Sequence, residues 1–216
     1  ESVYGGQKGG FQECDQTTPY NYYGKSKLEG EYVVLKKENS LVLRTNIFGW
    51  NIQDKTSLGE WVLNELKDGK LIKGFTDARV STIYTCELAK IIYLSLNKEL
   101  SGTYNCASKD SCSKYEFALK LAHWFGYDKD LIQPITIEQF NFKTKRVKDL
   151  SLCVNKIEKD LDFHLPTIDH SVEGFYRDYH SGISFQIKDN NKLIYRQVPG
   201  IPYGRQFIEN DDIEAV

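Results

Sequence analysis

Methionine is absent from the sequence, since none of the 216 residues is Met. We therefore expect the chain to be an internal piece of a longer protein, or a processed product. No apolar run approaches the about 20 residues that a membrane-spanning helix needs, and no signal peptide is visible. These absences predict a cytoplasmic protein with no membrane partner.

Cysteine is scarce, and charge of one sign is not in excess. The five cysteines form no Cys-x-x-Cys pair, and their odd number favours reduced thiols over a disulfide framework. The four histidines stand at no metal-ligand spacing from the cysteines, so we expect no structural zinc. The net charge of -2 argues against a protein that binds nucleic acid by electrostatic attraction.

The most informative stretch is residues 17–31, which predicts a helix. Thr18 is the expected N-cap, and Pro19 suits the first helical position. Tyr23 and Lys27 lie four residues apart, so their side chains emerge on one face. A free phenol titrates near ~10, and a nearby cation favours the phenolate. Such a pair can protonate the oxygen that is left when a hydride reaches a carbonyl carbon.

The Tyr-x-x-x-Lys spacing is weak evidence by itself, because it also begins at Tyr4 and at Tyr32. The first repeat runs through two glycines and is not expected to be helical. The repeat at Tyr32 is typical of ordinary packing beside a solvated lysine. Tyr23 differs because Gly24 and Ser26 flank it, and small residues let other groups approach closely. On spacing alone, an exposed helical pair without a chemical role stays open.

The order of the other predicted elements indicates an α/β fold. The short apolar run from Leu41 to Thr45 predicts a buried parallel strand. Ligands of parallel sheets bind beyond the carboxyl ends of the strands, which places residues 45–48 at a crevice. Further helices are expected at residues 57–67, 86–96, 155–161 and 167–179, and a further strand at 102–107. Another helix is expected to begin after a cap at Ser111 or Ser113.

Residues 23–31 (YGKSKLEGE) and 41–49 (LVLRTNIFG) together resemble the extended short-chain dehydrogenase/reductase family, and within it the dTDP-4-dehydrorhamnose reductase-like branch. The resemblance covers residues 1–181. It implies the C-terminal half of a Rossmann-like α/β fold with its small substrate-binding subdomain, without the N-terminal cofactor-binding half. It also implies an NAD(P)-dependent reductase of a nucleotide-linked keto-deoxysugar, and a homodimer is one assembly that it allows.

The resemblance assigns roles to five residues near the crevice. In the family the tyrosine is the catalytic acid/base, while the lysine lowers the tyrosine's pKa and binds the nicotinamide ribose; these roles carry over to Tyr23 and Lys27. Thr45, Asn46 and Ile47 would line NAD or NADP. The rhamnose branch has a substrate-contacting tryptophan where this chain has Ile47, whereas Asn46 resembles the substrate-contacting asparagine of nucleotide-sugar epimerases. An epimerase or dehydratase therefore stays open, as does a non-catalytic regulatory member.

Two arginines are expected near the phosphates of the substrate. The family places polar or basic groups near the nucleotide diphosphate in the segment of Arg79, and a guanidinium can hold phosphate in a bidentate way. Arg146 and Asp149 match an Arg-Pro-x-Asp-x-x-Leu pattern of the family, with Val147 in place of the proline. A surface ion pair at Arg79 and a solvated loop at Arg146 are the structural alternatives.

Both ends of the sequence point to missing parts. Residues 1–15 look like the end of a strand that runs into a glycine-rich loop, and the family's catalytic Ser/Thr would lie just before Glu1, with Ser2 a weaker candidate. Residues 184–195 alternate with a period of two, which predicts a hairpin. Residues 201–216 resemble the opening of a DegT/DnrJ/EryC1 sugar aminotransferase, which uses pyridoxal phosphate (PLP).

We therefore expect a reductase or epimerase part at residues 1–181, followed by a linker and the start of a second domain at residues 182–216. PLP would concern this protein only if that tail belongs to a fused aminotransferase. Because the first strand–loop–helix of the fold is missing, we also expect this piece to bind NAD(P) poorly and to be inactive alone.

Overall fold

The computed structural model describes residues 1–5, 8–51, 55–140, 142 and 146–187. The helices are α1 (Tyr22–Val34), α2 (Leu58–Lys67), α3 (Thr85–Asn97), α4 (Lys114–Phe125), α5 (Asn155–Leu161) and α6 (Ile168–His180), with 3-10 turns η1 (Lys129–Leu131) and η2 (Ile137–Gln139). The strands are β1 (Leu41–Arg44), β2 (Ile47–Phe48), β3 (Ile72–Phe75), β4 (Arg79–Val80), β5 (Ile83–Tyr84), β6 (Gly102–Asn105), β7 (Cys112–Ser113) and β8 (Ile132–Ile135).

The strands form pairs, most of which are parallel. β1 runs parallel to β6, β2 to β5 and β3 to β8, whereas β4 and β7 are antiparallel. A parallel pair needs a crossover connection, and helices supply it here, as α2 and α3 do between β1 and β6. The mixed α/β fold with parallel strands that the sequence predicts is thus confirmed.

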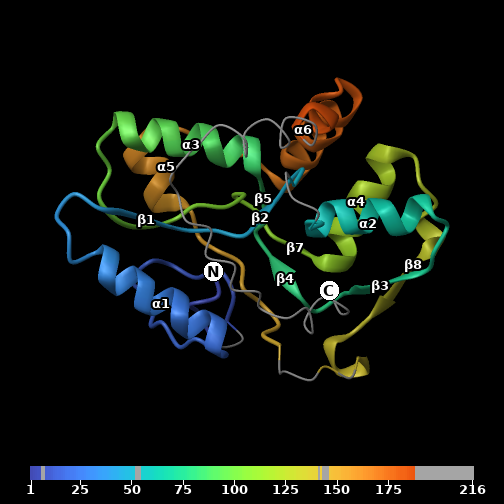
Figure 1. The fold of residues 1–216 in the computed structure, drawn as a ribbon. Helices are drawn as coiled ribbons and strands as arrows, with labels where there is room; N and C mark the ends of the chain where they lie inside the picture. Colours follow the sequence, from blue (N-terminus) through green and yellow to red (C-terminus); the bar gives the residue numbers. More distant parts are fainter. Residues whose placement is uncertain (6–7, 52–54, 141, 143–145, 188–216) are drawn as a thin grey trace, which may run out of the picture.

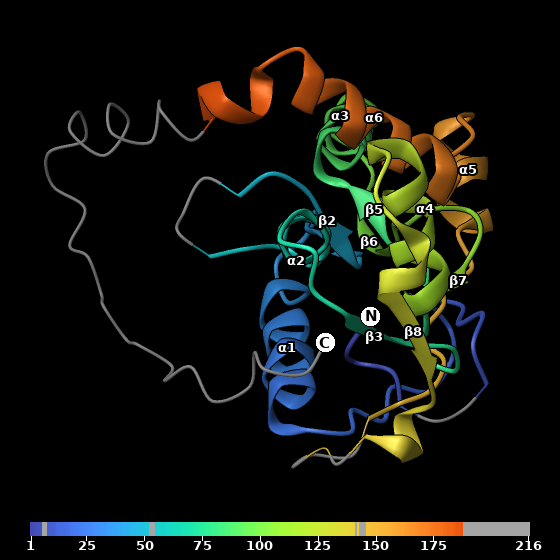
Figure 2. The same ribbon diagram turned by 90° about the vertical axis from the view of Figure 1, so that its right-hand side faces the viewer.

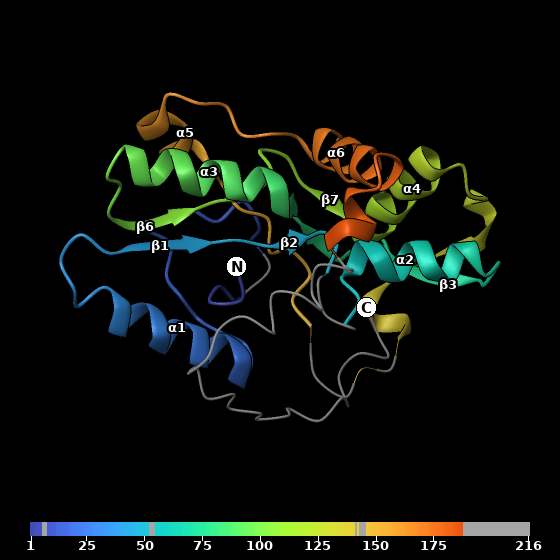
Figure 3. The ribbon, with the colours of Figure 1, turned by 45° about the horizontal axis from the view of Figure 1, so that its top comes forward.

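The elements gather into two lobes, each with its own core. In the first lobe, α3 and α5 lie on one side of the β1–β6 pair and α1 on the other (Figures 1 and 3). The second lobe contains α2, α4 and α6 with the β3–β8 pair, and α6 lies at the end of the molecule opposite α1 (Figures 1 and 2). The first core includes Tyr4, Ile83, Ile91, Tyr104 and Ile157, and the second includes Phe48, Phe117, Leu121, Val172 and Phe175.

Side-chain caps fix where two helices of the second lobe begin. Ser57 accepts a hydrogen bond from the backbone N–H of Glu60, whose carboxylate accepts from the Ser57 backbone, so α2 starts with a capping box. Ser113 and Glu116 repeat this arrangement at α4. Of the two serines that were expected as the cap of this helix, Ser113 is the cap and Ser111 is not. α5 spans the predicted residues, and α6 lies within one residue of its predicted ends.

Helix α1 begins later than the sequence predicted. Its N-cap is Asn21, whose side-chain oxygen accepts a hydrogen bond from the backbone N–H of Gly24 at 2.9 Å. The Thr18 hydroxyl instead donates to the carbonyl of Gly5 at 3.2 Å, so Thr18 is not the cap and Pro19 precedes the helix. The correction leaves Tyr23 and Lys27 inside the helix, one turn apart.

Three further expectations need correction. Leu41 to Leu43 are half-buried and not buried, because β1 has only β6 beside it in the described part of the chain. Residues 1–5 form a turn, in which the Tyr4 N–H donates to the Glu1 carbonyl, and not a strand. Residues 183–187 are helical, which excludes the predicted first strand of a hairpin. The aminotransferase-like residues 201–216 lie outside the described residues.

No helix within the described ranges combines the length and the apolar character that crossing a bilayer requires.

Candidate functional site

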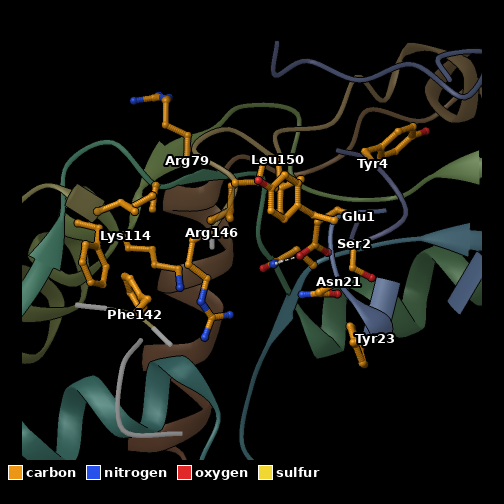
Figure 4. Close-up of a pocket in the computed structure, with 17 residues that line it drawn as sticks. Glu1, Ser2, Tyr4, Asn21, Tyr23, Arg79, Lys114, Phe142, Arg146 and Leu150 are labelled. Atoms are coloured by element: carbon orange, nitrogen blue, oxygen red, sulfur yellow. Dashed lines mark hydrogen bonds between the residues drawn. The ribbon is translucent and has the colours of Figure 1, made fainter. Parts of the chain in front are cut away.

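A cavity of about 240 Å³ lies between the two lobes, and most of the site residues that the sequence predicted line it (Figure 4). Its walls come from the N-terminal segment, the start of α1, the β1–β2 link, β4 and the start of α4. Ile137, Phe142 and residues 146–150 complete them. Its polar and charged lining residues include Glu1, Ser2, Asn21, Tyr23, Asn46, Arg79, Lys114 and Arg146. The fold thus joins groups that lie more than a hundred residues apart in the sequence.

The Tyr23–Lys27 pair is formed as predicted. The Lys27 ammonium lies 5.2 Å from the centroid of the Tyr23 ring, which is the distance of a cation–π contact. Tyr23 lines the cavity and is 59% exposed. Lys27 is exposed and does not line the cavity, so its charge acts on the site through its contact with the Tyr23 ring. This arrangement leaves the phenol accessible to a ligand in the cavity.

Gly24 brings the Tyr23 helix against the N-terminal segment. A Cβ added at Gly24 would lie 2.2 Å from the carbonyl oxygen of Ser2, a distance that real Cβ atoms do not show. Ser2 also lines the cavity beside Tyr23, which is where a hydroxyl partner for the tyrosine would be needed. The small residue next to Tyr23 therefore has the close-packing role that the sequence suggested.

We predict that Gly24→Ala destabilises the chain by about 1–3 kcal/mol, because the backbone of Ser2 has to move away from the added methyl group. Gly30→Ala is the matched control, since it lies on the same helix with nothing within 4 Å of its added Cβ. It should stabilise the chain by about 0.5–1 kcal/mol through helix propensity. Urea unfolding of both variants measures the difference, and equal stabilities would show that the close approach is unimportant.

The segment from the end of β1 to the start of β2 contains three predicted residues, Thr45, Asn46 and Ile47, and their surroundings differ. The Asn46 side-chain amide donates to the Glu1 carboxylate at 2.8 Å and lines the cavity. Ile47 is 51% exposed and lines a second, open hollow with Phe48. The Thr45 hydroxyl is buried and has no hydrogen-bond partner among the described residues. A buried hydroxyl without a partner is costly, so Thr45 still needs a hydrogen-bond partner that the described residues do not supply.

The two predicted phosphate-binding arginines differ in their surroundings. The Arg79 guanidinium is held by Glu116 at 3.3 Å and donates to the Ser111 carbonyl at 2.9 Å. It points away from the cavity that its stem lines (Figure 4). Arg146 points into the cavity, with its guanidinium 5.1 Å from the Phe142 ring centroid. Arg146 is thus placed for ligand contact, whereas Arg79 has the surface ion pair that we gave as its alternative.

Lys114 is a cavity residue that the sequence reasoning missed. Burial, together with the nearby Arg146 guanidinium, lowers the pKa of its ammonium from 10.5 to about 8. It is the first residue of α4, directly after the capping Ser113. The first turn of a helix favours acidic side chains, so a lysine at this position was the signal that could have revealed it.

A buried ion pair ties α1 to the sheet. Arg44 at the end of β1 donates to both carboxylate oxygens of Glu31, with the shortest contact at 2.7 Å. The same guanidinium donates to the Tyr4 hydroxyl at 2.6 Å. Gly24 is the only fully buried residue of α1, so this pair is a main attachment of the helix. Because Tyr4 lines the cavity, Arg44 connects two of its walls.

The pattern of the family described as "RmlD substrate binding domain" matches residues 1–181. The chain belongs to this family. Among curated proteins, it is 27% identical over 187 residues to the probable low-salt glycan biosynthesis reductase Agl14 of Haloferax volcanii, which covers 83% of this chain and 62% of that protein. It is also 26% identical over 165 residues to the methionine adenosyltransferase 2 subunit beta of Danio rerio, with 72% and 51% covered.

Among solved structures, the dTDP-4-dehydrorhamnose reductase of Bacillus anthracis in complex with NADP superimposes with a TM-score of 0.74 at 25% identity. The match covers 82% of this chain and 63% of that chain. This member of the RmlD family therefore spans less than two thirds of the relatives it matches. The likeness supports the fold, and it leaves the activity of the whole protein to be argued from the site.

Proposed function

We propose that this RmlD-family chain is the proton-donating and substrate-binding part of an NAD(P)-dependent reductase that acts on a nucleotide-linked keto-deoxysugar. The observation that carries the proposal is that Tyr23, Asn46 and Arg146 line the same cavity. A proton donor, an amide and a cation are the groups that a carbonyl, a sugar and a phosphate require. The names of its relatives support a place in the synthesis of cell-surface polysaccharide.

The residues of this chain hold the carbonyl and move one proton. The Tyr23 phenol donates its proton to the carbonyl oxygen as the carbon is reduced, so a ketone becomes a secondary alcohol. The Lys27 ammonium beside the ring stabilises the phenolate that remains. The Ser2 hydroxyl, on the neighbouring wall, would donate to the same oxygen.

The residues at the β1–β2 link fit a nicotinamide cofactor. The unpartnered hydroxyl of Thr45, the exposed side chain of Ile47 and the exposed Lys27 would hold its nicotinamide end. A nicotinamide cofactor supplies the hydride for carbonyl reduction when it is bound. We propose that the remaining part of the longer protein binds its diphosphate, and the choice between NAD and NADP rests with that part.

Turnover by the longer protein that contains this chain tests the proposal. We expect a dTDP- or UDP-linked 4-keto-6-deoxysugar to be reduced, with one NADH or NADPH consumed for each product molecule. An epimerase or dehydratase would convert substrate without net consumption of the cofactor, so the stoichiometry separates these reactions. Conversion without cofactor consumption would contradict a reductase.

A regulatory subunit is the second candidate function. The observation that favours it is the similarity to a protein that is named as a subunit of methionine adenosyltransferase, an enzyme of another reaction. A subunit of this kind would keep the fold and bind a partner enzyme without turning over a nucleotide sugar. Co-purification with such an enzyme, together with no keto-sugar reduction, would favour this function over the reductase.

A cytoplasmic location belongs to the proposal, and the five unpaired cysteines support it, because reduced thiols are usual in that compartment. A homodimer and a fused PLP-dependent aminotransferase are further proposals that gel filtration and the sequence of the longer protein would test.

A further inference from the structure

We propose that Lys114, acting with Arg146, is the anion-binding group of the cavity and makes the binding of a nucleotide diphosphate dependent on pH. This inference rests on the proposed function, because it names the groups that recognise the charged part of the proposed substrate. It assigns the role to a lysine in place of Arg79. The observations that carry it are the position of the ammonium, its lack of a partner and the charges around it.

The Lys114 ammonium is a cation without a direct ion-pair partner among the described residues. Lys114 lines the cavity from the first turn of α4, and its side chain points in the same direction as that of Arg146 (Figure 4). Within the described ranges, no carboxylate lies within ion-pair distance of either cation, and no hydrogen bond of the ammonium is found. Two neighbouring cations without a paired carboxylate repel each other, and an anion between them would relieve that repulsion.

The charges on the surrounding elements leave this part of the cavity basic. Glu1 is the carboxylate on the cavity wall that acts on Lys114, and it already accepts the Asn46 amide at 2.8 Å. Arg146, on the segment opposite α4, adds a second positive charge. One carboxylate therefore faces two cations, and the net positive charge that remains attracts an anion such as a diphosphate diester.

Arg79 does not add to this anion site. Its guanidinium is paired with Glu116 and bonded to Ser111 on the outer side of β4. A ligand in the cavity would have to break those contacts to use it. Lys114 would have to break none, and its stem is already ordered by packing at the start of a helix.

The direction of the pH effect follows from the pKa of Lys114, which burial and Arg146 lower to about 8. Below that pH the ammonium is charged and attracts an anion. As the pH rises through about 8 the amine loses its proton and the attraction, whereas Arg146 stays charged. Affinity for a diphosphate should therefore fall in this window, and binding near its middle should be accompanied by proton uptake.

Titration calorimetry of the 216-residue chain with UDP-glucose and dTDP-glucose tests the proposal without any need for hydride transfer. We expect Lys114→Gln to weaken binding by about 10- to 100-fold. Arg79→Gln should change it by less than about twofold. For the unchanged chain, affinity should fall by about tenfold between about pH 7 and about pH 9. Thermal unfolding of each variant establishes that it is folded.

Lys114→Arg is the deciding control, because it keeps the positive charge but removes a group that titrates in this range. It should bind at least within a few-fold of the unchanged chain near neutral pH and show no loss attributable to the protein as the pH rises. Equal binding by Lys114→Gln, an unchanged pH dependence in Lys114→Arg, or no binding by the unchanged chain would overturn the inference. Failure of keto-sugar reduction alone would overturn the proposed function and leave the anion site standing.

Discussion

Tyr23→Phe is expected to lower kcat for keto-sugar reduction by about 100- to 10,000-fold in the proposed longer protein, with little change in KM. The substitution removes only the hydroxyl that donates a proton, and the ring beside Lys27 remains in place. Binding of the substrate depends on the other walls of the cavity, so KM should stay close to its original value. Steady-state kinetics of cofactor oxidation measures both quantities.

Tyr32→Phe is the matched control for this experiment. Tyr32 lies on the same helix and is 59% exposed, as Tyr23 is, but it does not line the cavity. Loss of its hydroxyl should therefore leave kcat unchanged. Undiminished turnover by Tyr23→Phe would contradict the assignment, as would an equal loss in both variants, which would indicate a general effect on the helix.

Removing only one partner of the buried Arg44–Glu31 pair is expected to cause a large loss of stability. The side chains of Arg44 and Glu31 are 8% and 10% exposed, so either charge left alone would be buried without compensation. Arg44→Met and Glu31→Gln should each lower the free energy of unfolding, by about 3–5 kcal/mol for the arginine. Denaturant unfolding of the 216-residue chain measures these changes.

The double variant Arg44→Met/Glu31→Leu tests the physical reason. Because neither charge remains, it should lose much less stability than the sum of the single variants. Lys70→Met is a surface control, since its ion pair with Glu65 joins side chains that are 53% and 26% exposed. It should cost less than about 1 kcal/mol. Strictly additive losses at Arg44 and Glu31 would mean that the two charges do not act as a pair.

Local sequence signals were sufficient for the helices and for part of the site. Apolar spacing predicted α2, and apolar spacing with a hydroxyl cap predicted α4, because both signals depend only on neighbouring residues. The pairing of Tyr23 with Lys27 was predicted for the same reason, as one turn of a helix determines it. The cap of α1 was misjudged because Thr18 and Asn21 are both good capping residues, and the contact of Thr18 with Gly5 decided between them.

Long-range contacts account for what the sequence could not predict. Arg79 and Lys114 lie 35 positions apart and both line the cavity, and only the folded structure shows that the Arg79 guanidinium pairs with Glu116 while Lys114 has no such partner among the described residues. The half-buried state of β1 likewise depends on which strands lie beside it. The Arg44–Glu31 pair depends on how α1 crosses the sheet, which neither segment specifies alone.

Deuterium transfer tests the central claim most directly. The proposed longer protein would be given a dTDP-linked 4-keto-6-deoxysugar and NADH or NADPH deuterated at the transferred position, and the product would be examined by NMR. A reductase built on the Tyr23 cavity predicts one deuterium at the former carbonyl carbon of each product molecule, and almost no such product from Tyr23→Phe. Unchanged substrate, a product without deuterium at that carbon, or full labelling at the original rate by Tyr23→Phe would contradict it.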